Sequence, residues 1–235
     1  MANEENILAF NIAMPVYRLS KRLVFPSPEM ADEGGLLAVG GDLSVKRLVL
    51  AYSMGIFPWY SEGYPILWWS PDPRLILIPA EIKVSKNLRQ TIRQGKFRVT
   101  VNEAFEEVIR NCATVKRKGE HGTWITEEMI SAYIRLHKAG YAHSVESWDE
   151  DGLAGGLYGV MMGRAFFGES MFTKRSNASK VALVVYATEL GHNGCELIDC
   201  QVTTKHMKSL GAKEIPRAEF MKRLDKALKG GAAAP

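Results

Sequence analysis

The sequence contains few cysteines and no long apolar run. Its 235 residues include three cysteines, none of them in a Cys-x-x-Cys pair, so neither a disulfide framework nor a cysteine-rich zinc site is predicted. No uncharged apolar stretch reaches the roughly 18 residues that a membrane span needs. The opening MANEENILAF is acidic where a secretory signal would be basic. We therefore expect a cytoplasmic protein with reduced thiols and no membrane contact.

Motifs for covalent, metal and nucleotide chemistry are also absent. There is no Gly-x-Ser-x-Gly motif, the five histidines show no HExxH spacing, and neither GxxxxGK[ST] nor GxGxxG occurs. These absences argue against a serine nucleophile, a resident metal and a nucleotide held in a glycine-rich loop. What remains is catalysis by positioning a substrate that is already reactive, with no metal and no cofactor expected.

Positive charge is concentrated in one part of a chain whose net charge is only +4. Residues 76 to 118 hold ten Lys or Arg against four Glu. A basic stripe within this region consists of Lys86, Arg89, Arg93 and Lys96. Their spacing places them along one helical face, which is typical either of a solvated helix or of a surface that binds nucleic-acid phosphates. A second basic cluster covers residues 116 to 118.

The organisation of the chain changes near residue 75. Before it, turn formers and aromatic residues surround a helix predicted from about Val45 to Met54, and several prolines exclude long elements. After it, strands are predicted over 74–80, 97–102, 142–149, 153–172 (as a pair joined at Gly163 and Arg164) and 195–204. Helices are predicted over 85–94, 103–115, 126–140, 178–190, 206–210 and the C-terminal segment. This indicates an α+β or α/β protein with a central sheet, a small domain of residues 1–75 and a larger one of residues 76–235.

Two polar residues follow an apolar run in CELIDCQVTT. Asp199 and Gln201 are two positions apart, so on a strand their side chains would leave the same face and converge on one small target. The alternative is that they mark the frayed end of the strand and face water.

A carboxylate occurs among aromatic residues in AFFGESMF. Strict alternation would place Glu169 on one strand face with Phe167 and Met171. A carboxylate in such surroundings needs a cation or hydrogen bonds, and its pKa rises without them. The cation could be internal, such as Lys180, or could arrive as an amino group of the substrate.

Nine segments taken together resemble the bacterial leucyl/phenylalanyl-tRNA–protein transferases, over about Phe25 to Arg217. They are GGLLAVGGDLS, AYSMGIFPWY, ILWWSPDPR, HGTWITEEMISAYIRLHKAGYAHSVESW, GGLYG, FFGESMF, NASKVAL, LIDCQV and SLGAKEIPR. The resemblance implies transfer of Leu or Phe, and less well Met, from aminoacyl-tRNA to acceptor proteins with an N-terminal Arg or Lys, which creates an N-degron. It also implies an α+β fold with a small N-terminal domain followed by a GNAT-like, acetyltransferase-type catalytic domain with a central mixed sheet.

The resemblance also assigns site residues. It implies that the catalytic residues are Asp199, Gln201 and Glu169. It implies that the substrate-binding residues are Trp59, Trp124, Phe166, Met171, Tyr186 and Ile198, with Trp124 near the terminal adenosine of the tRNA. The basic stripe would then bind tRNA, and a monomer is expected.

Roles for the three catalytic candidates follow as hypotheses. Gln201 would accept a hydrogen bond from the attacking amine, Asp199 would orient Gln201 or receive the excess proton, and Glu169 would bind the amino group of the transferred residue. Two alternatives stay open: an N-acetyltransferase that uses acyl-CoA, and a noncatalytic RNA-binding protein.

Overall fold

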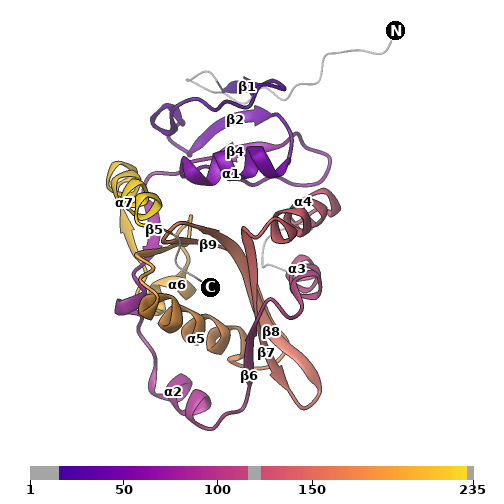
Figure 1. Ribbon diagram of the computed structural model, residues 1–235, viewed down its shortest axis with the longest axis vertical. Coiled ribbons are helices and arrows are strands. Elements are labelled where there is room, and N and C mark those ends of the chain that lie inside the picture. The colour runs from indigo at the N-terminus through magenta and orange to yellow at the C-terminus, as the bar shows by residue number, and fades with distance from the viewer. Residues whose placement is uncertain (1–15, 116–122, 232–235) are drawn as a thin grey trace.

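The computed structural model describes residues 16–115 and 123–231, which form a small sheet stacked on a larger one (Figure 1). The small sheet has the order β1-β2-β4-β3, in which only the β1–β2 pair is parallel. Its strands are β1 (Tyr17–Leu19), β2 (Leu36–Gly40), β3 (Phe57–Pro58) and β4 (Leu67–Trp69). This part of the chain also contains the 3-10 helix η1 (Pro28–Met30) and helix α1 (Val45–Ser53). The strands are short, as the many prolines require.

The large sheet has seven strands in the order β11-β5-β10-β9-β8-β7-β6. They are β5 (Arg74–Leu77), β6 (Arg98–Val101), β7 (Ala142–Asp149), β8 (Gly152–Met162), β9 (Ala165–Thr173), β10 (Leu197–Asp199) and β11 (Lys213–Ile215). All neighbours are antiparallel except β9 and β10. The remaining elements are η2 (Pro79–Glu81), α2 (Lys86–Arg93), α3 (Phe105–Ala113), α4 (Glu127–Lys138), α5 (Ala178–His192), α6 (Lys205–Ser209) and α7 (Arg217–Lys229). The expected α+β class with a mixed sheet and an N-terminal domain is confirmed.

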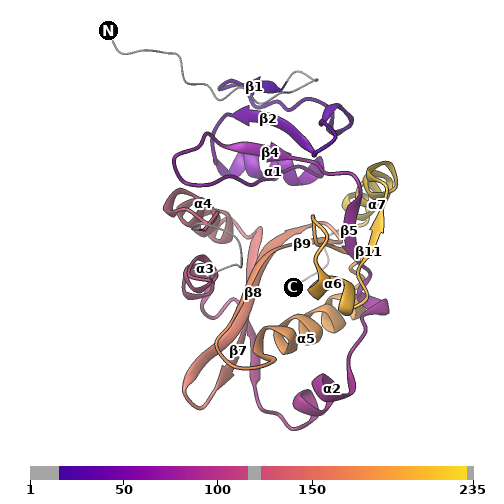
Figure 2. The same ribbon diagram turned by 180° about the vertical axis from the view of Figure 1, so that it is seen from behind.

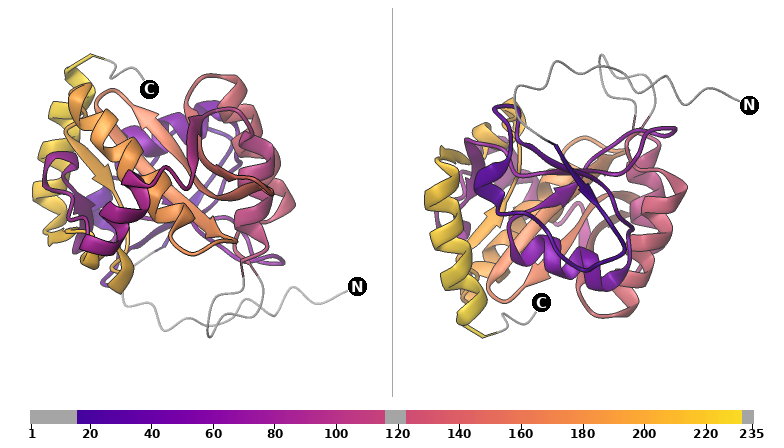
Figure 3. Two further views of the ribbon diagram at one scale, coloured as in Figure 1. Left: turned by 90° about the horizontal axis from the view of Figure 1, so that it is seen from below. Right: turned by 90° about the horizontal axis from the view of Figure 1, so that it is seen from above.

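Each face of the large sheet is covered by its own hydrophobic core. One core joins the small sheet and α1 to α3, α4 and α7, and the other packs α5 and α2 against the opposite face. Figure 2 shows this second face with α5 and α6, and Figure 3 shows α5 running across the sheet from below and the small sheet lying over it from above. The side chains of Leu157 and Tyr158 alternate between the two cores, as the strand period requires.

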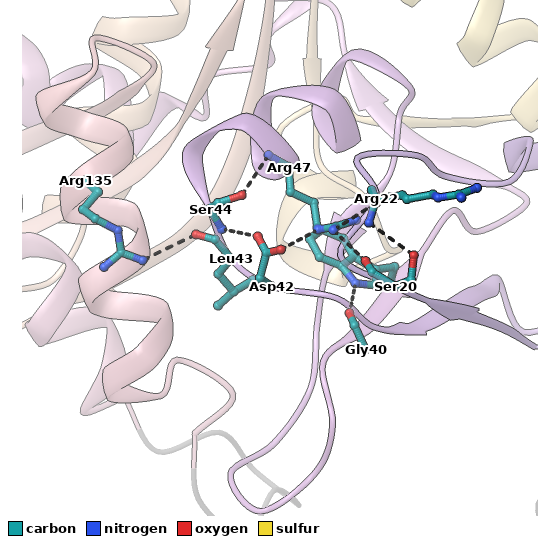
Figure 4. A network of polar contacts seen from close by, with 9 residues as sticks. Ser20, Arg22, Gly40, Asp42, Leu43, Ser44, Arg47 and Arg135 are labelled. Carbon is teal, nitrogen blue, oxygen red and sulfur yellow. Dashed lines mark hydrogen bonds and ion pairs between the residues drawn. The ribbon is translucent and has the colours of Figure 1, made fainter.

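A polar network fixes the N-terminal domain (Figure 4). The buried Arg47 side chain pairs with Asp42 at 3.2 Å and donates to the carbonyl oxygens of Ser20 and Arg22, while Ser44 caps α1 by accepting from the Arg47 amide. These bonds attach the segment after β1 to the start of α1. The capping role follows from the sequence, because Ser is a preferred residue before the first turn.

Two strand predictions were too long. The strand predicted over 195–204 contains only Leu197–Asp199, and the strand predicted over 74–80 ends at Leu77 before η2. By contrast, the strand pair joined at Gly163 and Arg164 and the helix near Val45 lie where they were predicted.

Candidate active site

A cavity of about 370 Å³ opens where β9 and β10 part. The two strands pair from Leu197 with Ala165 to Asp199 with Phe167. The segments that follow Asp199 and Phe167 no longer pair with each other, and both line the cavity. Its other walls come from β3 and the residue after it, from β8, from Leu183 of α5 and from α6. The predicted site residues that line it are Trp59, Trp124, Phe166, Glu169, Met171, Ile198 and Gln201. Residues far apart in the sequence therefore meet in one mainly apolar cavity.

Glu169 lines this cavity and lies at a β-bulge of β9. Tyr158 of β8 pairs with Ser170 and Gly159 pairs with Gly168, so Glu169 is the extra residue with no partner across the ladder. The extra residue reverses the alternation of β9. The prediction that Glu169 and Met171 share a face is therefore wrong. Glu169 and Phe167 do lie on one side, because Glu169 bonds to Tyr133 and Phe167 packs on Tyr52, the partner of Tyr133.

The bulge brings together two cavity residues that strict alternation would separate. Phe166 and Met171 both belong with the core around α5, and both line the cavity, whereas Phe167 packs in the other core. Phe166, before the bulge, and Met171, after it, therefore point to the same face of the sheet although they are five positions apart.

The Glu169 carboxylate is held by hydrogen bonds from neutral groups. The Tyr133 hydroxyl donates to Oε2 at 2.9 Å, and the Gln201 amide nitrogen donates to Oε1 at 3.2 Å. Tyr133 is in turn hydrogen-bonded to Tyr52 of α1. Burial raises the pKa of Glu169 from 4.5 to about 7, although these hydroxyls act in the opposite direction.

No cation of the described residues forms an ion pair with Glu169. Among the residues that the structure describes, no Lys or Arg nitrogen lies within 4.0 Å of its carboxylate, so the expected alternative of an ion pair with Lys180 is not formed. The carboxylate is thus placed at an apolar cavity with its charge unpaired.

Gln201 reaches the cavity through a left-handed backbone turn. Its φ is 54°, so the chain has left the strand geometry that was predicted for residues 199 to 201. Because an ionised carboxylate can only accept, the NH2 group of Gln201 faces Glu169. No described group donates a hydrogen bond to the side-chain amide carbonyl oxygen of Gln201, so this oxygen is available to a ligand.

Asp199 does not face the cavity. Its side chain is fully buried and receives two hydrogen bonds from Arg74, at 2.8 and 2.6 Å. The expectation that Asp199 and Gln201 converge on one target is wrong, because β10 ends at Asp199 and the backbone turns before Gln201. Arg74 was missed by the sequence analysis, and its only signal was its place in the ILWWSPDPR segment.

Tyr186 lies behind the cavity wall. Its ring packs edge-on against Phe166 with centroids 5.2 Å apart, and it is not among the residues that line the cavity. Burial raises the pKa of the Tyr186 hydroxyl, and the neighbouring Cys195 adds to this effect. Tyr186 therefore lies behind Phe166 and packs against it, and its contact with substrate stays a prediction.

The basic stripe lies on and just after α2, beyond α5 (Figure 1). Its four members Lys86, Arg89, Arg93 and Lys96 are all exposed. No ion pair joins any of the four to a described carboxylate. The second basic cluster, residues 116 to 118, lies outside the described residues.

Other reactive groups in the described ranges offer no further chemistry. None of the three cysteines forms a disulfide, and burial raises the pKa of the Cys195 thiol to about 11 and that of Cys200 further. In residues 16–115 and 123–231, no group of three or more His, Cys, Asp or Glu could hold a metal ion. Of the helices described, none combines the length and the apolar composition needed to cross a bilayer.

Comparison with known proteins gives one consistent result. Residues 76–225 match the family model described as leucyl/phenylalanyl-tRNA protein transferase, and residues 41–72 match the model of the N-terminal domain of the same family. A protein from Syntrophobacter fumaroxidans named leucyl/phenylalanyl-tRNA–protein transferase is 59% identical over 208 residues, which are 88% of this chain and 89% of that protein. A protein of the same name from Anaeromyxobacter sp. strain Fw109-5 is 58% identical over 215 residues, 92% of each chain.

Solved structures are more distant. The crystal structure of a conserved protein of unknown function from Staphylococcus epidermidis aligns with a TM-score of 0.38 at 8% identity, covering 77% of this chain and 68% of that one. L-PGS from Bacillus licheniformis aligns with a TM-score of 0.37 at 11% identity, covering 72% of this chain and 54% of that one. Similarity at this level does not identify the fold family.

Proposed function

The chain belongs to the leucyl/phenylalanyl-tRNA protein transferase family, and from this premise we propose that it forms a peptide bond between an amino acid carried by tRNA and the N-terminus of an acceptor protein. The amino acid is Leu or Phe, and less well Met, and the acceptor begins with Arg or Lys. The product carries a new N-terminal residue that acts as an N-degron. The reaction takes place in the cytoplasm, on a monomeric enzyme.

The observation that carries this proposal is the unpaired carboxylate of Glu169 at an apolar cavity. A bound Leu or Phe ester presents an apolar side chain and a free amino group a few ångströms apart. The apolar walls accept the first, and Glu169 accepts the second as a charge-assisted hydrogen bond. An ammonium beside Glu169 also lowers the pKa of the carboxyl that burial has raised.

The side-chain pocket is formed by the cavity residues Trp59, Phe166, Met171 and Ile198. Such a pocket discriminates softly, because one methylene changes binding by only about 1 to 3 kcal/mol. A preference among Leu, Phe and Met is therefore expected, with none of them excluded.

Catalysis relies on alignment. The aminoacyl ester is already activated, and a free α-amine has a pKa of about 8, so a minority of acceptor amines is uncharged at pH 7. The neutral nitrogen attacks the ester carbonyl, the bond to the ribose oxygen breaks, and the ribose oxygen takes up the proton that the amine loses. We propose that the carbonyl oxygen of Gln201 accepts a hydrogen bond from the attacking amine and holds its lone pair in line.

The tRNA is bound at two places. Trp124 at the cavity holds the unpaired 3′ end by stacking, which tolerates any base. The exposed basic stripe on α2 holds backbone phosphates, and the lack of described acidic partners for its side chains supports this.

We propose a GNAT-like fold for the catalytic domain. The parallel pair β9–β10, joined by α5 and opening into the cavity, supports this.

The experiment that tests the function is mass spectrometry of peptides after incubation with the protein. Peptides that begin with Arg, Lys, Asp or Met are mixed with Leu-tRNA or Phe-tRNA, and acetyl-CoA is supplied in a parallel reaction. A gain of one Leu or Phe on only the Arg and Lys peptides is expected. A gain of an acetyl group would instead identify an acetyltransferase, and no gain in any reaction would leave RNA binding as the function.

A further inference from the structure

Arg74 and Asp199 form a buried pair directly behind Gln201. The guanidinium Nε and Nη2 donate to the two carboxylate oxygens at 2.8 and 2.6 Å, and both side chains are almost completely excluded from solvent. The rings of Phe57 and Phe220 lie against the guanidinium, with centroids 4.9 and 4.5 Å from its central carbon. Arg74 therefore contacts both the N-terminal domain, through Phe57, and α7, through Phe220, and these contacts fix its position.

The carboxylate passes this constraint to the backbone of Gln201. Besides its bond from Arg74, Asp199 Oδ1 accepts the Gln201 amide N–H at 3.0 Å. The residue after Arg74 completes the attachment, because Leu75 donates to the Gln201 carbonyl oxygen at 3.2 Å and accepts from Cys200 N at 2.9 Å. These bonds hold Gln201 at a φ of 54°, a conformation that residues other than glycine rarely adopt.

Asp199 has no direct route to a proton of the substrate. Both of its oxygens are used by Arg74 and Gln201, and the side chain is fully buried and absent from the cavity wall. An attacking amine in the cavity meets the side chain of Gln201 first. The geometry is that of a support for Gln201 and not of a group that receives a proton.

We propose that Arg74 is a positioning residue for the transfer reaction, acting through Asp199 to hold the Gln201 backbone in the left-handed turn that aims its amide at the attacking amine. Asp199 is then a positioning residue as well, and it takes no proton. This inference rests on the proposed function, because it assigns Gln201 to the attacking amine.

The test is a double-mutant cycle on single-turnover transfer of Phe from Phe-tRNA to a peptide that begins with Arg. Asp199→Asn and Arg74→Gln each leave the remaining partner badly matched and misplace Gln201, which slows transfer by about a hundredfold. The double variant R74Q/D199N restores a neutral amide pair and keeps an acceptor for the Gln201 N–H. We expect it to transfer about tenfold faster than Asp199→Asn alone, since the two sites are directly coupled.

Two further measurements separate positioning from folding and from binding. Thermal unfolding establishes that each variant is folded, and the Kd for Phe-tRNA should stay within about threefold of the wild-type value, because neither residue lines the cavity. Arg74→Lys keeps the positive charge without the two-pronged contact, and we expect about a tenfold slower transfer at saturating Phe-tRNA. If Asp199→Asn or Arg74→Gln does not fold, the transfer rate of Arg74→Lys tests whether Arg74 positions Gln201.

Two outcomes would overturn the proposal. If Asp199 receives the proton, the double variant transfers no faster than Asp199→Asn. If Arg74→Lys transfers at the wild-type rate, Arg74 does not position Gln201. A wild-type protein that transfers nothing would refute the proposed function itself, whereas an active wild type with equally active variants would refute this inference alone.

Discussion

Replacing Glu169 by Gln should stabilise the unliganded protein more at pH 8 than at pH 5. The pKa of this carboxyl rises from 4.5 to about 7 on folding. Between these values the folded protein keeps a proton that the unfolded chain loses, so the stability of the wild-type protein falls as the pH rises through this window. A glutamine has no such titration, and its amide can accept from Gln201 and donate to the Tyr133 oxygen.

The magnitude follows from linkage. A shift from 4.5 to about 7 lowers the free energy of unfolding by about 2.5 kcal/mol between pH 5 and pH 8. The cavity admits water to one side of the carboxylate, which reduces this to about 2 kcal/mol. For a chain of this size, that corresponds to a Tm difference between variant and wild type about 5 °C larger at pH 8 than at pH 5.

The assay is thermal unfolding followed by circular dichroism at the two pH values. Glu150→Gln, in the exposed turn between β7 and β8, is the matched control and should show the same Tm difference at both pH values. A Glu169→Gln protein whose Tm difference does not grow with pH would refute the reasoning, because it would mean that folding does not raise the pKa of the carboxyl. The Glu169→Gln protein should also bind Phe-tRNA with a higher Kd, since it lacks the charge that pairs with the amino group.

Three further outcomes are expected. Tyr133→Phe removes a hydroxyl that donates to the cavity carboxylate, so the Kd for aminoacyl-tRNA at pH 7 should rise about tenfold, and an unchanged Kd would show that this bond is not used. Gly159→Ala would bring a methyl group against the Phe166 ring and a β9 carbonyl oxygen, so urea unfolding should show a loss of about 1 to 3 kcal/mol; Gly168→Ala, where only ordinary contacts form, is the control, and equal losses would contradict this account. Reversing Arg89 and Arg93 to Glu should weaken tRNA binding and flatten its salt dependence, by a slope of about 1 for each phosphate that is no longer bound, whereas an unchanged slope would make the stripe a solvated helix face.

Local features of the fold could be predicted because neighbouring residues determine them. Ser44 caps α1 and Thr126 caps α4 through their own side chains, and the Gly163–Arg164 turn joins two strands that pair along their length. In each case the residues that specify the feature lie within a few positions of it.

The site could be predicted only in part, because long-range contacts shape it. The bulge at Glu169 depends on how β9 pairs with β8, and the turn at Gln201 depends on Arg74, which lies 125 positions from Asp199 in the sequence. Strand periodicity alone predicts neither of these. Most of the site residues that the resemblance to a family implied line one cavity, but the resemblance did not show that Asp199 points away from it.

The most direct test of the central claim is the single-turnover rate of Phe transfer by Gln201→Ala, measured with saturating Phe-tRNA and an acceptor peptide that begins with Arg. If Gln201 aligns the attacking amine, the rate falls by about a hundredfold while the Kd for Phe-tRNA stays near the wild-type value. A wild-type rate in a folded variant would contradict the account.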